Sequence, residues 1–312
     1  MQRLGIAVVM ATATVPLSAQ APAGKTSVLG AKLEHRIAEL DDRLDGVLAV
    51  AIKDLTDGKT ILLHPDEVMP TASTIKIAVL AELYRQEAQR DPGQGARLAD
   101  TYVVDSADFL PGGDLLATFS PGVTRLTNRD LASLMMGLSD NSATNALIRR
   151  VGMERVNATL ESLGLKETRL RRRMLDLAAA RAGRENTATP RELVALLEAL
   201  WKGAGVAQGG GPFLNGALRE DLFRVMAFPK DRYLTRLLPE SARMANKPGW
   251  LEGVRVDAGI GLVPNRPFAI AVMITYAADD RAAEAVIAEI GLAAWNHFQG
   301  LAQGGSYGRR MP

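Results

Sequence analysis

The chain has 312 residues, of which 47% are hydrophobic and 23% are charged, and its formal net charge is +2. A chain of this length and composition can bury a substantial core, as one large domain or as two closely packed ones. The charges of both signs are spread along the sequence, which argues against a nucleic-acid-binding surface. The sequence has no cysteine, so disulfides and thiolate metal sites are excluded.

The first residues have the order of a secretory signal peptide. A basic residue precedes the apolar stretch from Leu4 to Val15, and small residues follow around Ala19 and Ala21. The stretch is too short for a stable membrane span, and no later segment approaches the ~20 apolar residues that a span requires. We therefore expect residues 1–21 to be removed and the mature protein to be periplasmic or secreted, without stable membrane insertion.

The next segments predict a helix followed by a hairpin. Apolar residues recur at helical spacing from Ser27 to Leu44, with Ser27 as the expected N-cap. Two short runs rich in Val, Ile and Leu then flank Asp57-Gly58, a dipeptide that tight hairpin turns prefer. We expect antiparallel strands over residues 46–55 and 59–63.

From Ser73 to about Leu222 the pattern is helical, with no convincing strand pair. The clearest helical segments are 75–89, 128–139, 142–151 and 190–202. The C-terminal part returns to sheet and then closes with a helix. Its expected strands are 243–250, 254–263 and 268–276, with a turn at 264–267 and the helix at 281–301.

Strands at both ends of the sequence predict an α+β fold in which the two ends complete one antiparallel sheet. The first and last helices would cover this sheet. We expect a discontinuous α/β lobe over residues 27–70 and 235–302, and an inserted helical lobe over 71–234, within a single overall domain. A cleft is expected at the seam between such lobes.

Ser73 and Lys76 are the first candidates for chemistry. A serine hydroxyl is a weak nucleophile at neutral pH and needs a base nearby. The Ser73-Thr74-Ile75-Lys76 spacing places a hydroxyl and an amine on one face of a helical first turn. An amine can act as the base if burial or neighbouring cations lower its pKa. Alone, the pattern is weak, because Ser-x-x-Lys occurs by chance about once in a chain of this length.

Two further motifs follow in order. Ser139-Asp140-Asn141 lies between two helical segments, and Lys247-Pro248-Gly249 ends an expected strand. With the first motif, they make the sequence resemble the class A β-lactamases and penicillin-binding proteins. The resemblance extends over nearly the whole mature chain, and includes Thr168-Arg169-Leu170 and Thr187-Ala188-Thr189-Pro190.

The resemblance implies roles for five side chains. Ser73 corresponds to the nucleophile and Lys76 to its neighbouring base. Ser139 would relay a proton to the leaving nitrogen, and Asn141 would donate to the side-chain amide of the substrate. Lys247 would hold a substrate carboxylate and lower nearby pKa values.

Three further residues follow from the same resemblance. Gly249 and Trp250 would contact the substrate. The backbone N–H groups of Ser73 and Trp250 would form the oxyanion hole, since two fixed donors at the developing negative oxygen contribute most to acyl transfer. Asp140 is expected to stabilise its loop rather than to touch substrate.

The expected catalytic glutamate of class A enzymes is missing. Aligned on Thr168-Arg169-Leu170, its position holds Met174, which can neither accept a proton nor orient water. Asp176 and Glu185 lie in the same loop and are the candidate replacement bases for deacylation. Asn186 stands where an aspartate would pair with Arg172, so a different loop path is a further expectation.

Pro248 is the second departure. It removes a hydroxyl that helps bind the substrate carboxylate in the family, and its missing N–H restricts it to an edge or terminal position in a sheet. Arg255 lies near an arginine that binds carboxylate in some relatives, but about one residue out of register, so it is left unassigned. The apolar residues after Gly113 form either a cleft wall or part of the core, and comprise Leu115, Leu116 and Phe119.

Three functions share this acylation chemistry. The leading hypothesis is a class A β-lactamase-like serine hydrolase that deacylates slowly. The alternatives are a cell-wall D,D-peptidase or transpeptidase, and a protein that captures β-lactams without turnover. Each would take a small β-lactam or peptidoglycan-like substrate, as a monomer and without a cofactor. A metal centre is not expected, because the three histidines are scattered without ligand spacing.

Overall fold

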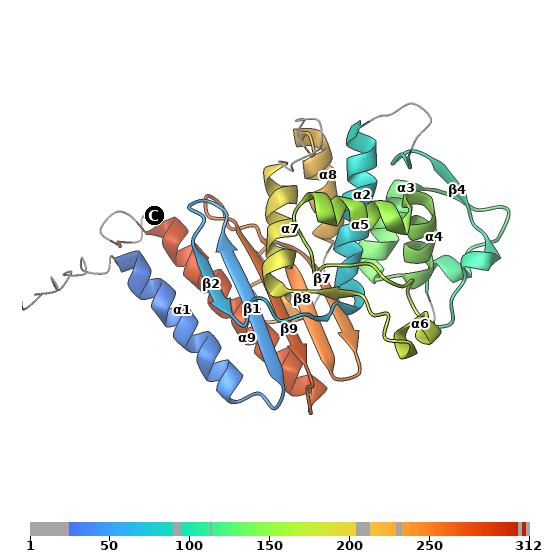
Figure 1. Cartoon of the computed structure of the whole chain (residues 1–312). Coiled ribbons are helices and arrows are strands. Elements are labelled where there is room, and N and C mark those ends of the chain that lie inside the picture. Colours follow the sequence, from blue (N-terminus) through green and yellow to red (C-terminus); the bar gives the residue numbers. More distant parts are fainter. Residues whose placement is uncertain are drawn as a thin grey trace, which may run out of the picture.

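The computed structural model describes residues 25–89, 95–112, 114–203, 213–228, 233–304 and 308–309. Its centre is a five-stranded antiparallel sheet in the order β2-β1-β9-β8-β7 (Figure 1). The strands are β1 (Val47–Asp54), β2 (Thr60–Leu63), β7 (Met244–Leu251), β8 (Val254–Gly261) and β9 (Phe268–Thr275). Helices α1 (Lys25–Asp42) and α9 (Asp280–Gln303) lie side by side along one face. This arrangement confirms the predicted α+β fold.

Pairing between β1 and β9 brings the two ends of the sequence together. The register runs from Val47 opposite Thr275 to Asp54 opposite Phe268. The N-terminal hairpin thereby extends a sheet that the C-terminal strands begin. At the other end of the sheet, β7 is an edge strand, so Pro248 can lie within it without leaving a neighbouring strand's acceptor unpaired.

Side-chain size alternates along β1. In β1, Leu48, Val50 and Ile52 pack toward α1 and α9. Ala49 and Ala51 of the same strand face the opposite core, where α7 (Pro190–Lys202) packs against β1 and β9. Because alternate residues of a strand face opposite sides, this sequence gives one thick apolar layer and one shallow layer that α7 can approach closely.

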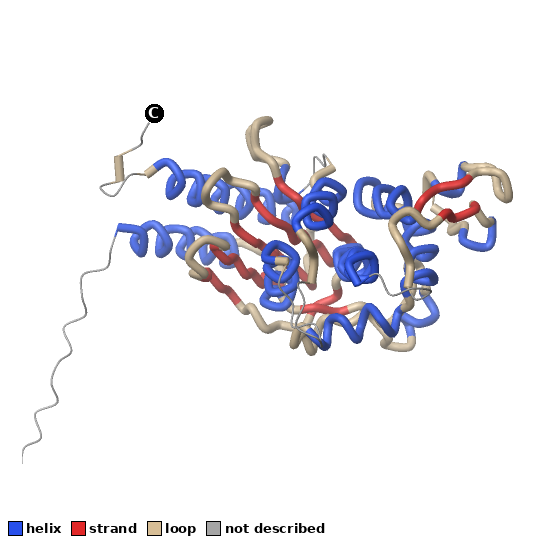
Figure 2. The backbone as a smooth tube through the Cα atoms, turned by 90° about the horizontal axis from the view of Figure 1, so that it is seen from above, coloured by secondary structure: helices blue, strands red, loops and turns tan. Residues whose placement is uncertain are grey.

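The middle of the chain is mainly helical, and Figure 2 shows most of its helices beyond the strands, away from α1. A 3₁₀ turn, Ala72–Ile75, precedes α2 (Lys76–Gln89), and a π-helical turn, Leu134–Leu138, ends the segment begun by α3 (Asn128–Ser133). The remaining helices are α4 (Asn141–Val151), α5 (Met153–Ser162), α6 (Leu177–Arg181) and α8 (Gly216–Met226). Shorter 3₁₀ turns are Ser106–Asp108, Leu116–Thr118 and Tyr233–Thr235.

Two details of the sequence prediction are wrong. The middle block does contain a strand pair, because β4 (Thr101–Val103) pairs with β5 (Arg125–Thr127). Its β6 (Thr187–Ala188) also pairs with β3 (Met69–Pro70), which lies just before the block. These strands have two or three residues each, too few to show a period of two. In addition, Ser27 lies inside α1 and not at its N-cap, because the helix already includes Lys25.

The expected signal peptide, residues 1–21, lies outside the described residues. Within the described residues, no helix has the length and apolar character needed to cross a membrane. The lobe boundaries at residues 70 and 235 stay predictions.

Close packing of α9 against the Tyr233–Thr235 turn depends on Gly291. A Cβ at this position would lie 2.4 Å from the carbonyl oxygen of Leu234, whereas one at Gly300 of the same helix would meet no atom within 4 Å. We expect Gly291→Ala to lower the free energy of unfolding by about 1–3 kcal/mol through overpacking. Gly300→Ala should be neutral or stabilise by up to about 1 kcal/mol through helix propensity.

Urea unfolding followed by circular dichroism measures both variants. Equal effects of the two substitutions would show that α9 does not pack on the turn in this way.

Candidate active site

A cleft of about 570 Å³ is lined by the predicted nucleophile, Ser73, together with Ser139, Asn141 and Trp250. Its walls come mainly from five segments that are far apart in the sequence: Ala72–Ser73, Gly112 with Asp114 and Leu115, Leu138–Asn141, the loop from Arg172 to Leu177, and Trp250–Glu252. We call this feature the cleft. The structure thus brings together the segments that the sequence motifs mark.

Ser73 is held by a 3₁₀ turn under β7. In a 3₁₀ helix, residues three apart lie on the same side, which aligns Ser73 with Lys76 at the start of α2. The strand passes so closely that a Cβ on Gly249 would lie 2.8 Å from the Ser73 nitrogen. The Thr74 hydroxyl also donates to the carbonyl of Lys247 at 3.1 Å. Only glycine permits β7 to approach the Ser73 turn this closely.

The hydroxyl of Ser139 lies between two buried lysines. Lys76 Nζ is 3.1 Å from Ser139 Oγ, and Lys247 Nζ is 3.0 Å from the same atom. Both amines are also held by oxygen acceptors: Lys76 Nζ donates to the Ser139 carbonyl at 2.7 Å, and Lys247 Nζ to the Pro248 carbonyl at 2.8 Å. Because a hydroxyl that accepts from an amine keeps its own proton available, Ser139 is suited to pass a proton to a substrate in the cleft.

Asn141 completes this network. Its Oδ1 accepts from Lys76 Nζ at 2.8 Å. Since the amide oxygen is used inside the protein, the amide nitrogen is the group that a substrate would meet. This orientation agrees with the donor role that the sequence motif implies for Asn141.

Burial lowers the pKa of the Lys76 ammonium from its ordinary value of 10.5 to about 7, although the Asp114 and Asp140 carboxylates act in the opposite direction. The side chain is fully buried, and desolvation disfavours its charged form. A lysine with such a pKa is neutral in a substantial fraction of molecules at neutral pH. It can therefore accept a proton from a nearby hydroxyl.

Three cleft residues have a left-handed backbone without being glycine. They are Ala72 at φ 46°, Ser139 at φ 58° and Leu175 at φ 58°. Such a conformation costs on the order of 1–3 kcal/mol per residue, and it is retained where the surroundings fix the chain. At Ser139 the strain follows from the π-helical turn that ends there, and Asp140 then caps α4 by accepting from the Ala143 N–H at 2.7 Å.

The loop that carries Met174 is fixed at both ends. Asn145 of α4 accepts from the Met174 N–H at 2.9 Å and donates to the Met174 carbonyl at 3.1 Å. The buried Arg172 pairs with Glu185 at 2.8 Å, one residue before the position expected from the family pattern. Asn186 accepts from the Arg172 N–H at 3.0 Å and donates to its carbonyl at 3.1 Å. The loop is therefore closed through a shifted ion pair, and Met174 lines the cleft.

Asp176 and Glu185, the predicted replacement bases, make their contacts within the loop. Asp176 caps α6 by accepting from the Ala179 N–H at 2.9 Å, and Glu185 is held by Arg172. Neither is among the described residues that line the cleft. Their carboxylates serve the loop itself, because a helix cap and a buried guanidinium both need an acceptor.

Arg255 is turned away from the cleft. Its guanidinium pairs with Asp280 at 2.7 Å and with Glu284 at 3.0 Å, both on α9. This agrees with the one-residue offset noted in the sequence, since adjacent residues of a strand face opposite sides. Lys247, which contacts Ser139, remains the cation that the sequence motif assigns to a substrate carboxylate.

The apolar group after Gly113 is divided between the cleft and the core. Leu115 lines the cleft, whereas Leu116 is fully buried and Phe119 packs against the core.

Sequence reasoning missed two carboxylates and one amide. Asp114 lines the cleft and accepts from the Ser142 N–H at 2.7 Å and the Ser142 hydroxyl at 2.8 Å, and Glu252 lies exposed at the rim. Asn145 lies four residues after Asn141, so the two side chains are on the same face of α4. This spacing was the signal in the sequence that Asn145 lies near the site.

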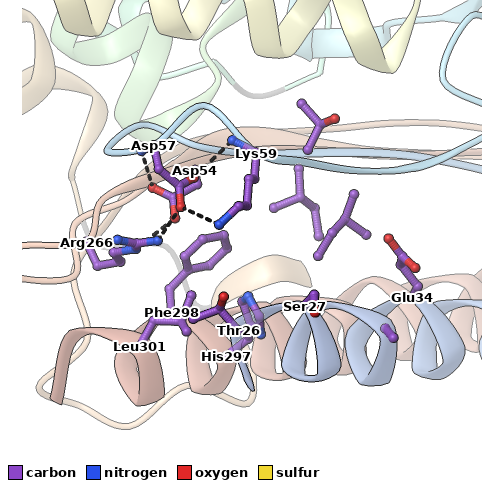
Figure 3. Close-up of a pocket in the computed structure, with 15 residues that line it drawn as sticks. Thr26, Ser27, Glu34, Asp54, Asp57, Lys59, Arg266, His297, Phe298 and Leu301 are labelled. Atoms are coloured by element: carbon purple, nitrogen blue, oxygen red, sulfur yellow. Dashed lines mark hydrogen bonds and ion pairs between the residues drawn. The ribbon is translucent and has the colours of Figure 1, made fainter. Parts of the chain in front are cut away.

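A second pocket, of about 370 Å³, lies between α1, α9 and the β1–β2 hairpin (Figure 3). Four of its charged groups form ion pairs: Arg266 is 2.7 Å from both Asp54 and Asp57, and Lys59 is 3.2 Å from Asp57. None of the predicted site residues is in it. Among the described residues, no group of three or more histidine, aspartate or glutamate side chains could hold a metal ion.

The chain resembles solved structures with the same fold. An ancestral class A β-lactamase is 29% identical, with a TM-score of 0.74, and the match covers 85% of this chain and all of the other. The protein titled PBP-A is 24% identical, with a TM-score of 0.73, and the match covers 86% of this chain and 96% of that one. The second likeness shows the fold alone.

Curated relatives match over most of their length. A β-lactamase of Streptomyces lavendulae is 29% identical over 85% of both chains. β-Lactamase AST-1 of Nocardia asteroides is 28% identical over 88% of both. A family model described as the β-lactamase enzyme family matches residues 32–298. With this match, and with the three motifs joined by hydrogen bonds at Ser139, the chain belongs to the β-lactamase enzyme family.

Proposed function

We propose that Ser73 forms an acyl-enzyme with β-lactams or related amides, and that this intermediate is released slowly. The observation that carries the proposal is the contrast within one cleft. The groups needed to form an acyl-enzyme converge on Ser139 and Lys76, whereas the position expected to supply the deacylating base holds Met174. Family membership supports the serine hydrolase chemistry.

Acylation begins with the Ser73 hydroxyl. Neutral Lys76 takes its proton as Ser73 Oγ bonds to the substrate carbonyl carbon. The Ser73 and Trp250 N–H groups stabilise the negative oxygen of the tetrahedral intermediate. The C–N bond then breaks, and the Ser139 hydroxyl donates its proton to the leaving nitrogen. Protonated Lys76 replaces the proton on Ser139. Ser73 remains attached to the acyl group as an ester.

Deacylation needs a base that activates water, and a thioether cannot serve. General-base assistance is worth about 10²–10⁴-fold, so its loss leaves the ester long-lived. The other cleft carboxylates do not replace it in this proposal, because Asp114 is committed to the N-terminus of α4 and Glu252 is exposed at the rim. Slow release is therefore expected.

A cell-wall D,D-peptidase or transpeptidase is the second candidate. Met174 favours it, because such an enzyme shares the acylation groups and does not require the class A glutamate. Export to the periplasm, which the first residues indicate, would place either activity beside the cell wall, and we propose this location as well.

Met174→Glu tests the account of slow release. Incubation of the native protein with a penicillin should give an intact-mass increase equal to the whole β-lactam, which persists after excess drug is removed. Met174→Glu should shorten the adduct's half-life by about tenfold or more, because residue 174, whose backbone Asn145 holds, is among the residues that line the cleft.

Ser73→Ala is the control and should give no adduct. An adduct that survives Ser73→Ala would refute Ser73 as nucleophile. An unchanged half-life in Met174→Glu would instead show that residue 174 does not face the ester.

The pH dependence of acylation tests Lys76. Protonated Lys76 cannot accept the Ser73 proton, and its pKa is lowered to about 7. The acylation rate at subsaturating β-lactam should therefore fall about tenfold per pH unit below this value and level off above it. Stopped-flow absorbance with a chromogenic cephalosporin measures the rate, and a flat profile through pH 7 would exclude Lys76 as the base.

A further inference from the structure

Exposed apolar side chains gather around the cleft. Of the large hydrophobic residues exposed in the described part of the chain, five line it: Leu115, Leu138, Leu175, Leu177 and Trp250. Their exposed fractions range from 41% for Leu115 to 63% for Trp250. They come from four separate segments, so one element's amphipathic pattern does not account for them. Exposed apolar surface concentrated in one concavity is typical of a binding site.

Leu175 provides a second, independent observation. Its backbone is left-handed, with φ 58°, and its side chain is 44% exposed. Glycine or asparagine adopts this conformation with less strain, and an exposed position offers leucine no packing in return. The neighbouring Met174 is held on both sides by Asn145, so the loop keeps the Leu175 side chain at the cleft. Leucine here is better explained by a ligand than by the fold.

The polar and apolar walls of the cleft suggest how a substrate lies. Ser139 and Lys247 offer a proton and a positive charge, which suit the leaving nitrogen and a carboxylate of the departing part. Met174, Leu175 and Leu177 form an apolar wall on the loop. If the nitrogen of an acyl donor lies at Ser139, its acyl side chain points toward this loop.

We propose that the cleft selects acyl donors with an extended apolar group on the acyl side, held by Leu175, Leu177 and Trp250. The proposal rests on the proposed acylation of Ser73, and it names the substrate class. The cavity of about 570 Å³ has room for such a group as well as the reacting amide. The apolar group gains binding by leaving water, and the exposed leucines lose their contact with water when it binds.

Penicillins that differ only in the length of a straight acyl chain, from acetyl to octanoyl, test the proposal. The second-order rate of adduct formation, followed by intact mass, should rise with length. A fully buried methylene corresponds to about a fourfold gain, so about twofold per methylene is expected in an open cleft. A matched series of esters with a constant acyl group and a lengthening alcohol should show no such rise.

Two variants assign the effect to the loop. Leu175→Asn and Leu177→Ser should each reduce the ratio of octanoyl to acetyl rates by about threefold or more. Asparagine tolerates the left-handed backbone, so the melting temperature of Leu175→Asn should be unchanged or higher. Val123→Ser is the matched control, since Val123 is 71% exposed and does not line the cleft, and it should keep the native ratio.

The outcomes separate this proposal from the acyl-enzyme itself. Adducts that form at one rate for all acyl lengths, or a length dependence that both loop variants retain, would overturn the apolar wall while leaving Ser73 as nucleophile. A dependence on the alcohol instead of the acyl chain would place the apolar group on the departing part and also overturn it. Absence of any adduct would remove the proposed function on which the inference rests.

Discussion

The burial of two lysine side chains around one serine hydroxyl is the interaction on which the site depends. Lys76 and Lys247 are almost completely inaccessible to solvent, yet their Nζ atoms lie 3.1 and 3.0 Å from Ser139 Oγ. Removing an ammonium group from water is costly unless acceptors replace the water. Backbone carbonyls of Ser139 and Pro248 do so here, and Lys76 also responds by a lowered pKa. Burial destabilises the charged form of Lys76 and therefore favours its neutral form, which can act as a base.

This arrangement constrains the rest of the fold. The three motifs come from the first turn before α2, the turn before α4, and the edge strand β7, and each must be held to the others within hydrogen-bonding distance. Gly249 permits β7 to lie against the Ser73 turn, and the π-helical turn ends with Ser139 in a strained conformation that points it at both lysines. The pairing of β1 with β9 stabilises the sheet to which β7 belongs, and thereby the position of β7.

The loop from Arg172 to Leu177 shows how one scaffold can hold different chemistry. Its anchoring is preserved through Asn145 and a shifted Arg172–Glu185 pair, while the side chains that it presents to the cleft are Met174, Leu175 and Leu177. We infer that the position suited to activating water has become part of an apolar wall. In the proposed function, formation of the ester and its hydrolysis therefore depend on different segments of the chain.

The sequence alone was sufficient for the parts of this account that have a local signal. Helical periodicity gave α7 at its observed bounds, and Asp57-Gly58 marked the β1–β2 hairpin. The order of the three motifs predicted that Ser73, Ser139 and Lys247 belong to one site. The short pairs β3–β6 and β4–β5 were missed, because two or three residues carry no period and their stability comes from tertiary packing. Likewise, no local pattern could show that Glu185 rather than residue 186 meets Arg172, or that Leu175 and Leu177 stay exposed at the cleft.

A crystal structure of the protein after reaction with a penicillin tests the central claim most directly. The account predicts continuous electron density from Ser73 Oγ to the carbonyl carbon of the opened ring, with the carbonyl oxygen within hydrogen-bonding distance of the Ser73 and Trp250 N–H groups. Intact β-lactam in the cleft, or an adduct on another residue with Lys76 and Lys247 turned away from Ser139, would contradict it.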